Sequence, residues 1–111
     1  MTTKTDTTTI RILNDVLRKT FLTGQVLLTR GVAQAPAEHR GEIIQKVQTF
    51  EAFTPDNDPH GERDFGGFEV QGTKYLWKID YYAPDMIHGS EDPTDPAKTT
   101  RVLTIMRADE Y

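Results

Sequence analysis

The stretch Thr73-Lys74-Tyr75-Leu76-Trp77-Lys78-Ile79-Asp80-Tyr81-Tyr82 decides the fold of this 111-residue chain. Aromatic and β-branched residues are favoured in strands, and here they recur at every second position. Two sets of side chains therefore alternate along the stretch: Tyr75, Trp77, Ile79 and Tyr81 on one face, and Lys74, Leu76, Lys78, Asp80 and Tyr82 on the other. The pattern predicts one long strand.

Three shorter strands are predicted around this one. Gln71-Gly72 is typical of a tight hairpin turn, so Phe68–Val70 should pair with the long strand. Arg101–Met106 carries apolar residues on both faces, which indicates an inner strand. Gln25–Thr29 is a short apolar run that we interpret as the fourth strand.

The N-terminal half predicts a first helix that starts between Thr7 and Thr9 and stops near Gly24. An apolar stripe recurs at steps of three and four, widened by Val16: Ile10, Leu13, Leu17 and Phe21. Charged and amide side chains lie off that stripe: Arg11, Asn14, Asp15, Arg18 and Lys19.

A second helix is predicted to begin around Pro36, because proline suits a first helical turn. The element order is thus α-β-α-β-β-β. It predicts a two-layer α+β fold in which two N-terminal helices pack on a mainly antiparallel sheet of about four strands. Residues 1–8 are expected to be a disordered tail and residues 9–111 a single domain.

Composition narrows the classes of function. The chain has no cysteine, which removes disulfides and thiolate chemistry. Residues 51–111 hold 13 acids and 6 bases, a net charge of −7 that repels phosphate backbones, so we expect no direct nucleic-acid binding. No apolar run approaches the length of a membrane span, and the threonine-rich start is not a secretory signal. A cytoplasmic protein is expected.

Acidic residues gather in two loop segments, and the first allows a metal hypothesis. If Asp56 is aligned with position 1 of an EF-hand loop, Gly61 falls correctly at position 6, but His60 at position 5 and Gly67 at position 12 do not fit. An irregular divalent-cation site, in a small metal-dependent enzyme or a metal-stabilised domain, remains the alternative reading. Its candidate ligands are Asp56, Asp58, His60, Glu62 and Asp64.

The favoured hypothesis is a binding module rather than an enzyme, and no catalytic residue or cofactor is assigned. Loops 54–64 and 85–95 would lie at one end of the sheet and present carboxylates to a basic protein surface. An exposed tyrosine at the strand end would add contact area. The candidate contact residues are Asp56, Asp58, Glu62, Asp64, Tyr82, Asp85, Glu91, Asp92 and Asp95.

Several stretches together resemble a bacterial family of small proteins of unassigned function, common on plasmids and other mobile elements. They are residues 56–66, Trp77–Tyr82, Ser90–Pro96, Arg101–Met106 and Asp109–Tyr111. The resemblance covers roughly Ile10 to the end of the chain and implies no activity, cofactor or catalytic residue. It implies a setting, in which small acidic proteins of the anti-CRISPR or anti-restriction type block host defence proteins by mimicking phosphate.

Overall fold

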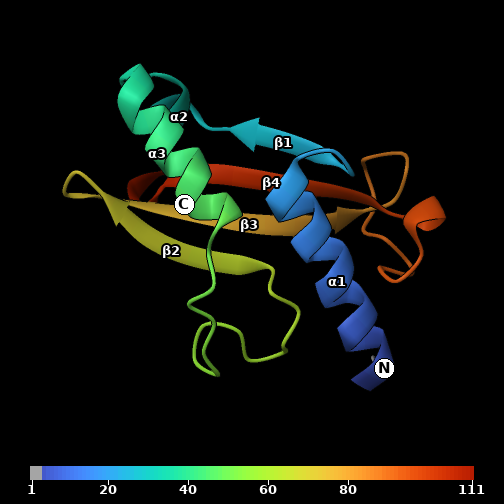
Figure 1. Ribbon diagram of the computed structural model, residues 1–111. Coiled ribbons are helices and arrows are strands. Elements are labelled where there is room, and N and C mark those ends of the chain that lie inside the picture. The colour runs from blue at the N-terminus through green and yellow to red at the C-terminus, as the bar shows by residue number, and fades with distance from the viewer. Residues whose placement is uncertain (1–3) are drawn as a thin grey trace.

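The computed structural model describes residues 4–111, and it confirms an α+β fold with a mostly antiparallel four-stranded sheet (Figure 1). The strands lie in the order β1-β4-β3-β2. Their bounds are β1 (Gln25–Leu28), β2 (Phe65–Val70), β3 (Thr73–Tyr82) and β4 (Thr100–Arg107). The helices are α1 (Lys4–Thr20), α2 (Arg30–Ala33) and α3 (Ala37–Gln48), with short 3-10 turns η1 (Pro96–Lys98) and η2 (Ala108–Glu110).

The β2–β3 hairpin follows the prediction closely. Gln71 and Gly72 both have positive φ, 51° and 79°, which is the backbone of the turn that joins two tightly paired strands. Strand β2 begins at Phe65, three residues before the predicted start at Phe68. It can run close to β3 because a Cβ on Gly66 would lie only 2.5 Å from Nε1 of Trp77.

Strand β4 is an inner strand, as its two apolar faces predicted. It pairs antiparallel with β3 and parallel with β1, so the sheet is mixed. The chain leaves β1 through α2 and α3 before it returns to the sheet, and this long connection allows β1 and β4 to run in the same direction. The four-residue α2 was not predicted.

Helix α1 differs from its prediction at both ends. It begins at Lys4, inside the segment expected to be a disordered tail, and residues 1–3 of that segment lie outside the described residues. Thr7 lies near Gly61, so packing against a distant loop supports the early turns. The helix ends at Thr20 because Phe21 adopts a left-handed φ of 61° and donates from its N–H to the Leu17 carbonyl at 2.8 Å.

The buried face of α1 is more polar than the apolar stripe predicted. Asn14 and Arg18, placed off the stripe by the sequence, are both fully buried, whereas Val16 is 39% exposed. The burial is tolerated because both polar side chains find hydrogen-bond partners from other elements. Helix α1 therefore brings polar chemistry into the interior.

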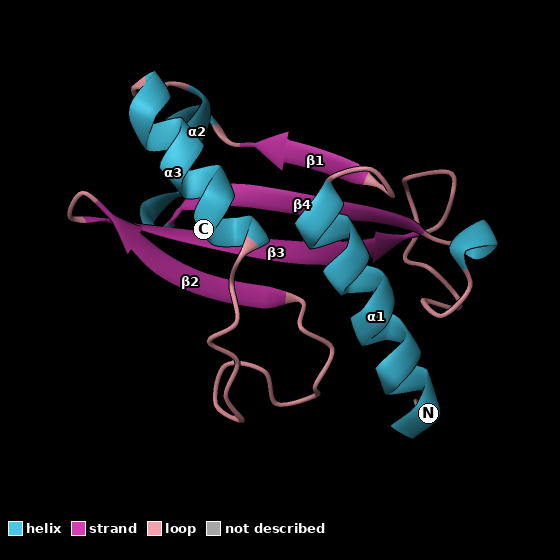
Figure 2. Ribbon diagram, in the orientation of Figure 1, coloured by secondary structure: helices cyan, strands magenta, loops and turns pink. Residues whose placement is uncertain are grey.

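The helices lie over one face of the sheet (Figure 2). Between the two layers, α1, α2 and α3 contribute apolar residues that pack against β2, β3 and β4. The most buried members of this core are Leu17, Val32, Ile43, Val47, Trp77, Leu103 and Ile105. Among the described residues, no helix is both long and apolar enough to cross a membrane.

Candidate functional site

The two acidic loops lie at the same end of the sheet. Residues 54–64, here called the inner loop, lead into β2, and residues 83–99, here called the outer loop, connect β3 to β4. Because β2 and β3 are antiparallel, the start of β2 lies beside the end of β3. Helix α1 lies between the two loops in Figure 1.

A buried pair of polar residues, Asn14 and Arg101, connects these loops. Arg101 Nε donates to Asn14 Oδ1 at 2.8 Å, and another nitrogen of the same guanidinium donates to the carbonyl of Pro93 in the outer loop. The amide of Asn14 donates to the carbonyl of Glu62 in the inner loop at 3.0 Å. We call this pair the Asn14–Arg101 centre, and it holds both loops through one set of contacts.

Tyr81 closes the centre on the side of the sheet. Its hydroxyl accepts from Asn14 at 2.8 Å and donates to Glu62 Oε1 at 2.8 Å. Burial raises the pKa of Tyr81, and the carboxylate of Glu62 raises it further. Arg101 lies over the Tyr81 ring at 5.2 Å, and burial lowers the pKa of its guanidinium. The tyrosine therefore stays a neutral hydrogen-bond donor.

A second buried arginine fixes the inner loop from the other side. Arg18 donates to the carbonyl of Val47 at 2.9 Å and to Asp15 at 3.1 Å, and Asp15 also accepts from Arg63 of the inner loop at 3.1 Å. The Arg18 guanidinium lies 5.3 Å from the Trp77 ring centroid, a cation–π contact. This network attaches the inner loop to α1.

Three of the five predicted site residues of the inner loop are half-buried: Asp58, Glu62 and Asp64. Glu62 bonds to Tyr81, and Asp58 accepts from the backbone of Arg63 at 3.0 Å. Asp64 is half-buried, and its burial, together with the negative charge of Glu62, raises its pKa. The two exposed members are Asp56 and His60.

The metal hypothesis needs the five inner-loop candidates to converge. Across residues 4–111, no group of three histidine or carboxylate side chains is arranged to hold a metal ion. The inner loop does line an open depression of about 460 Å³, but Arg11 and Arg63 share its wall with Asp58 and His60. These cations favour an anion over a divalent cation there.

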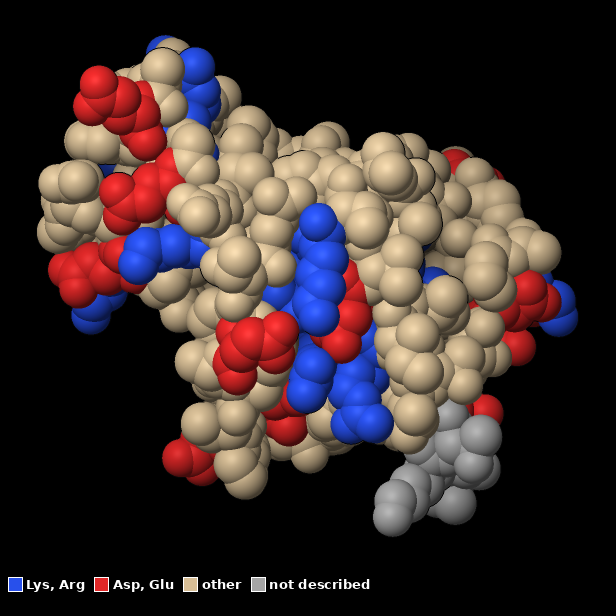
Figure 3. Space-filling model, viewed as in Figure 1, with Lys and Arg blue, Asp and Glu red and all other residues tan. Residues whose placement is uncertain are grey.

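Basic side chains also interrupt the acidic surface. On the face shown in Figure 3, lysine and arginine gather in the middle, with aspartate and glutamate around them. Lys19 pairs with Glu51 at 3.6 Å, an example of this mixing. The two loops therefore do not form one continuous acidic array on this face.

The outer loop uses carboxylates to fix its own backbone; Asp85 is exposed and Asp92 is half-buried. Asp85 accepts from the N–H groups of Ile87 and His88 at 2.8 and 3.1 Å, and from His88 Nδ1 at 2.7 Å. The histidine bond is the largest reason why the pKa of Asp85 is lowered. Asp92 accepts from the hydroxyl and the N–H of Thr94, and its pKa is lowered for that reason.

The remaining candidate residues of the outer loop also make contacts within that loop or with its neighbouring strand. Asp95 caps η1 by accepting from the N–H of Ala97 at 2.9 Å, and Glu91 is exposed beside Lys98 at 3.6 Å. Tyr82 is half-buried rather than fully exposed, and it forms a β-bridge with Gly89. The loop is therefore shaped by its own contacts.

The tip of the outer loop presents apolar side chains. Ile87 is 78% exposed, and Met86 is 38% exposed with a left-handed φ of 62°, which is rare for a residue with a side chain. The N–H of Ala83 donates to the carbonyl of His88 at 2.7 Å and closes the tip. A depression of about 300 Å³ lies in the same loop, lined by residues 83–85, 88–89, 91 and 97–98.

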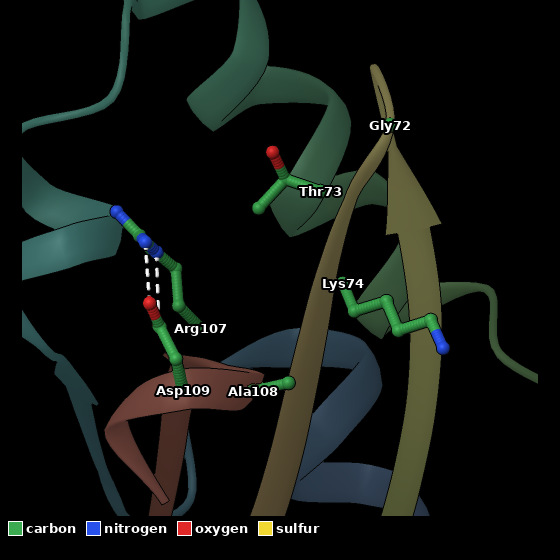
Figure 4. Close-up of a pocket in the computed structure, with 6 residues that line it drawn as sticks. All are labelled: Gly72, Thr73, Lys74, Arg107, Ala108 and Asp109. Atoms are coloured by element: carbon green, nitrogen blue, oxygen red, sulfur yellow. Dashed lines mark hydrogen bonds and ion pairs between the residues drawn. The ribbon is translucent and has the colours of Figure 1, made fainter.

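Another depression lies at the opposite end of the sheet (Figure 4). It holds about 280 Å³ between the β2–β3 turn and η2, and Arg107 lines it. The guanidinium of Arg107 is already paired with Asp109, and Lys74 points away in Figure 4. Asp109 thus takes the place that an external anion would occupy.

The sequence identified the carboxylates but not the residues that organise them. Asn14 lies 67 positions from Tyr81 and 87 positions from Arg101, so no local pattern joins it to them. The one available signal was a pair of polar residues, Asn14 and Arg18, four positions apart beside an apolar stripe.

Comparison with known proteins places most of the chain in a family. Residues 28–110 match the model of a family described as a protein of unknown function, DUF3768. No curated protein and no solved structure matches the chain.

Proposed function

This chain belongs to the DUF3768 family, a family of unknown function, and from the geometry of this member we propose that it is a protein-binding module. The outer loop is its contact element, and a basic surface on another protein is its target.

The exposed tip of the outer loop carries this proposal. Ile87 is 78% exposed, yet the loop that holds it is fixed by the contacts of Asp85 and by the Ala83–His88 bond. A preorganised loop loses little conformational entropy on binding, and a projecting apolar side chain can fill a pocket on a partner. The left-handed Met86 stores strain of the kind that concentrates at functional sites.

Charge defines the kind of partner. Asp85 and Asp92 have lowered pKa values, so both remain ionised at neutral pH, and Glu91 and Asp95 add to the same loop. An apolar tip surrounded by carboxylates fits an apolar pocket within a basic surface, and the charges would speed association.

Basic surfaces of this kind are typical of proteins that bind nucleic acid. We therefore extend the proposal to an inhibitor, carried by a mobile element, that occupies such a surface on a host defence protein. The inner loop contributes less in this version, because Glu62 and Asp64 are turned toward the interior.

The test is affinity capture from a bacterial lysate with three baits: the wild-type chain, Ile87→Asp and Asp56→Ala. Asp56 is an exposed carboxylate of the inner loop, which makes it the matched control. We expect one or more proteins to be held by the wild type and the control and lost by Ile87→Asp. Each captured protein is then titrated with the purified chain at several salt concentrations, and its affinity should fall as salt rises.

The proposal fails if Ile87→Asp captures the same proteins as the wild type with the same affinity. It also fails if the affinity of every captured protein is independent of salt, because the carboxylates of the outer loop would then have no role in recognition.

A further inference from the structure

Strand β1 forms an edge of the sheet whose outer side carries unpaired backbone groups. In the part of the chain that the structure describes, β1 pairs with β4 alone. The N–H of Thr29 donates to the carbonyl of Ile105 at 3.0 Å. Because neighbouring residues of a strand point to opposite edges, the N–H and C=O of Val26 and Leu28 point away from the sheet.

Apart from its short length, this edge lacks the features that usually protect an edge strand. The four residues Gln25–Leu28 include no charge and no proline. Leu27 and Leu28 are 50% and 38% exposed, and Leu22, in the turn just before the strand, is 85% exposed. The other edge of the sheet, β2, contains two adjacent glycines and the exposed Glu69. Apolar surface thus gathers at one edge only.

We propose that β1 is the interface for a second copy of this chain. The two β1 strands pair antiparallel about a two-fold axis at Leu27, so that Val26 lies opposite Leu28 of the second copy. This is the register in which the outward N–H and C=O groups of both strands meet, giving four hydrogen bonds. The result is an eight-stranded sheet with both helical layers on the same side.

Charge favours a second copy over the basic partner of the outer loop. The strand is uncharged, so it offers nothing for a basic surface to recognise. In the proposed register Arg30 lies opposite Gly24, and Gln25 lies opposite Thr29, so no like charges meet. The interface is small and depends on leucines for its area, which predicts an association that varies with concentration.

The absence of cysteine provides a direct test of the register. In a Leu27→Cys variant the two cysteines would face each other with Cα atoms about 4.5 Å apart, within the range for a disulfide. In Leu28→Cys they would be offset by two residues, beyond about 7 Å. We expect mild oxidation of the full-length chain to give a covalent dimer with Leu27→Cys and little with Leu28→Cys on a non-reducing gel.

An Ile87→Cys variant controls for random collision, because that residue is more exposed than Leu27 and lies on the outer loop. Equal cross-linking of all three variants would overturn the proposal, and so would the absence of cross-linking in Leu27→Cys.

Sedimentation of the unmodified chain gives an independent measurement. We expect a dimer that dissociates on dilution, and Leu27→Lys should raise its dissociation constant at least tenfold by placing two positive charges opposite each other. Leu28→Pro removes only an outward N–H and should have a similar effect without disturbing the pairing with β4. A wild-type chain that stays monomeric up to about 1 mM would overturn the proposal.

The dimer and the proposed function can fail separately. Leu27→Lys should dissociate the dimer and leave the outer loop intact, and Ile87→Asp should remove partner capture and leave the dimer intact.

Discussion

The inner and outer loops have similar acidic compositions but use their carboxylates differently. Each contains four acidic residues and at least one proline in its acidic segment. The inner loop directs Glu62 and Asp64 toward the interior, where they meet Tyr81 and other carboxylates. The outer loop leaves Asp85 exposed and Asp92 half-buried, and it bonds both to its own backbone.

The difference comes from the surroundings of each loop. Helix α1 passes beside the inner loop and offers it buried hydrogen-bond donors, such as the Asn14 amide. Arg101 donates to the Pro93 carbonyl of the outer loop, but the carboxylates of Asp85 and Asp92 accept from N–H groups of the loop itself. The inner loop is thus bonded to the buried side chains of α1, whereas the outer loop leaves part of its acidic segment available to a partner.

The largest expected effect tests whether the hydrogen bonds of Asn14 hold the inner loop to the rest of the fold. Asn14→Ala would leave Arg101 Nε buried without its acceptor and would remove two donated bonds, so it should lower the free energy of unfolding by about 3 kcal/mol. Urea denaturation followed by circular dichroism measures this. Asp56→Ala, on the exposed part of the inner loop, should change stability by less than about 0.5 kcal/mol. Equal effects of the two variants would show that the inner loop is not anchored at Asn14.

A smaller effect compares one glycine near each loop: Gly66, just after the inner loop, and Gly89, within the outer loop. At Gly66, after the inner loop, a Cβ would lie 2.5 Å from Trp77 Nε1 and 2.9 Å from the Phe50 ring, so Gly66→Ala should destabilise the fold by about 1–3 kcal/mol. At Gly89, in the outer loop, the nearest atom would be 3.9 Å away, and Gly89→Ala should be nearly neutral. Thermal unfolding of both variants decides whether the chain is more tightly packed where the inner loop enters β2 than in the outer loop.

The smallest effect concerns how the free energy of unfolding changes with pH, which should have opposite signs for Asp64 and Asp85. The pKa of Asp64 is raised from its usual 3.8 by burial, so the folded state binds its proton more tightly than the unfolded state does. Its contribution to stability therefore falls as the pH rises from 3.8 to the higher folded pKa. We expect Asp64→Asn to be more stable than the wild type at pH 7, with the difference disappearing below pH 3.8.

Asp85 should show the opposite sign. Its pKa is lowered from 3.8, so it stabilises the fold above that value and loses this contribution as the pH falls through the lower folded pKa. Asp85→Asn should be slightly less stable than the wild type at pH 7 and equal to it in strong acid. Denaturation curves at several pH values measure both differences, and the same sign for both residues would remove the electrostatic contrast between the loops.

Local patterns were sufficient to predict the β2–β3 hairpin and the inner position of β4. Alternation along Thr73–Tyr82 and the Gln71-Gly72 turn act between neighbours, so the sequence displays them directly. The extra helix α2 spans only four residues, too few to show a periodicity. The parallel pairing of β1 depends on how the chain returns to the sheet, which no local pattern reports.

The candidate site was predictable only in part, because contacts between residues far apart in the sequence leave no local pattern. The carboxylates of both loops are visible in the sequence, but the direction of Glu62 in the inner loop depends on Asn14, 48 residues away, and on Tyr81, 19 residues away. Asn14 was placed off the buried face because amides usually seek water. It is buried because Glu62, Tyr81 and Arg101 together satisfy its hydrogen bonds.

The Asn14–Arg101 centre also has a consequence for the motions of the molecule. Arg101 contacts Asn14 with one nitrogen and Pro93 with another, so separating the outer loop from the centre would leave a buried guanidinium incompletely bonded. Opening either loop then weakens the attachment of the other, and the two should behave as one cooperative unit in hydrogen exchange. A partner that binds the outer loop would therefore slow the hydrogen exchange of inner-loop amides with which it has no contact.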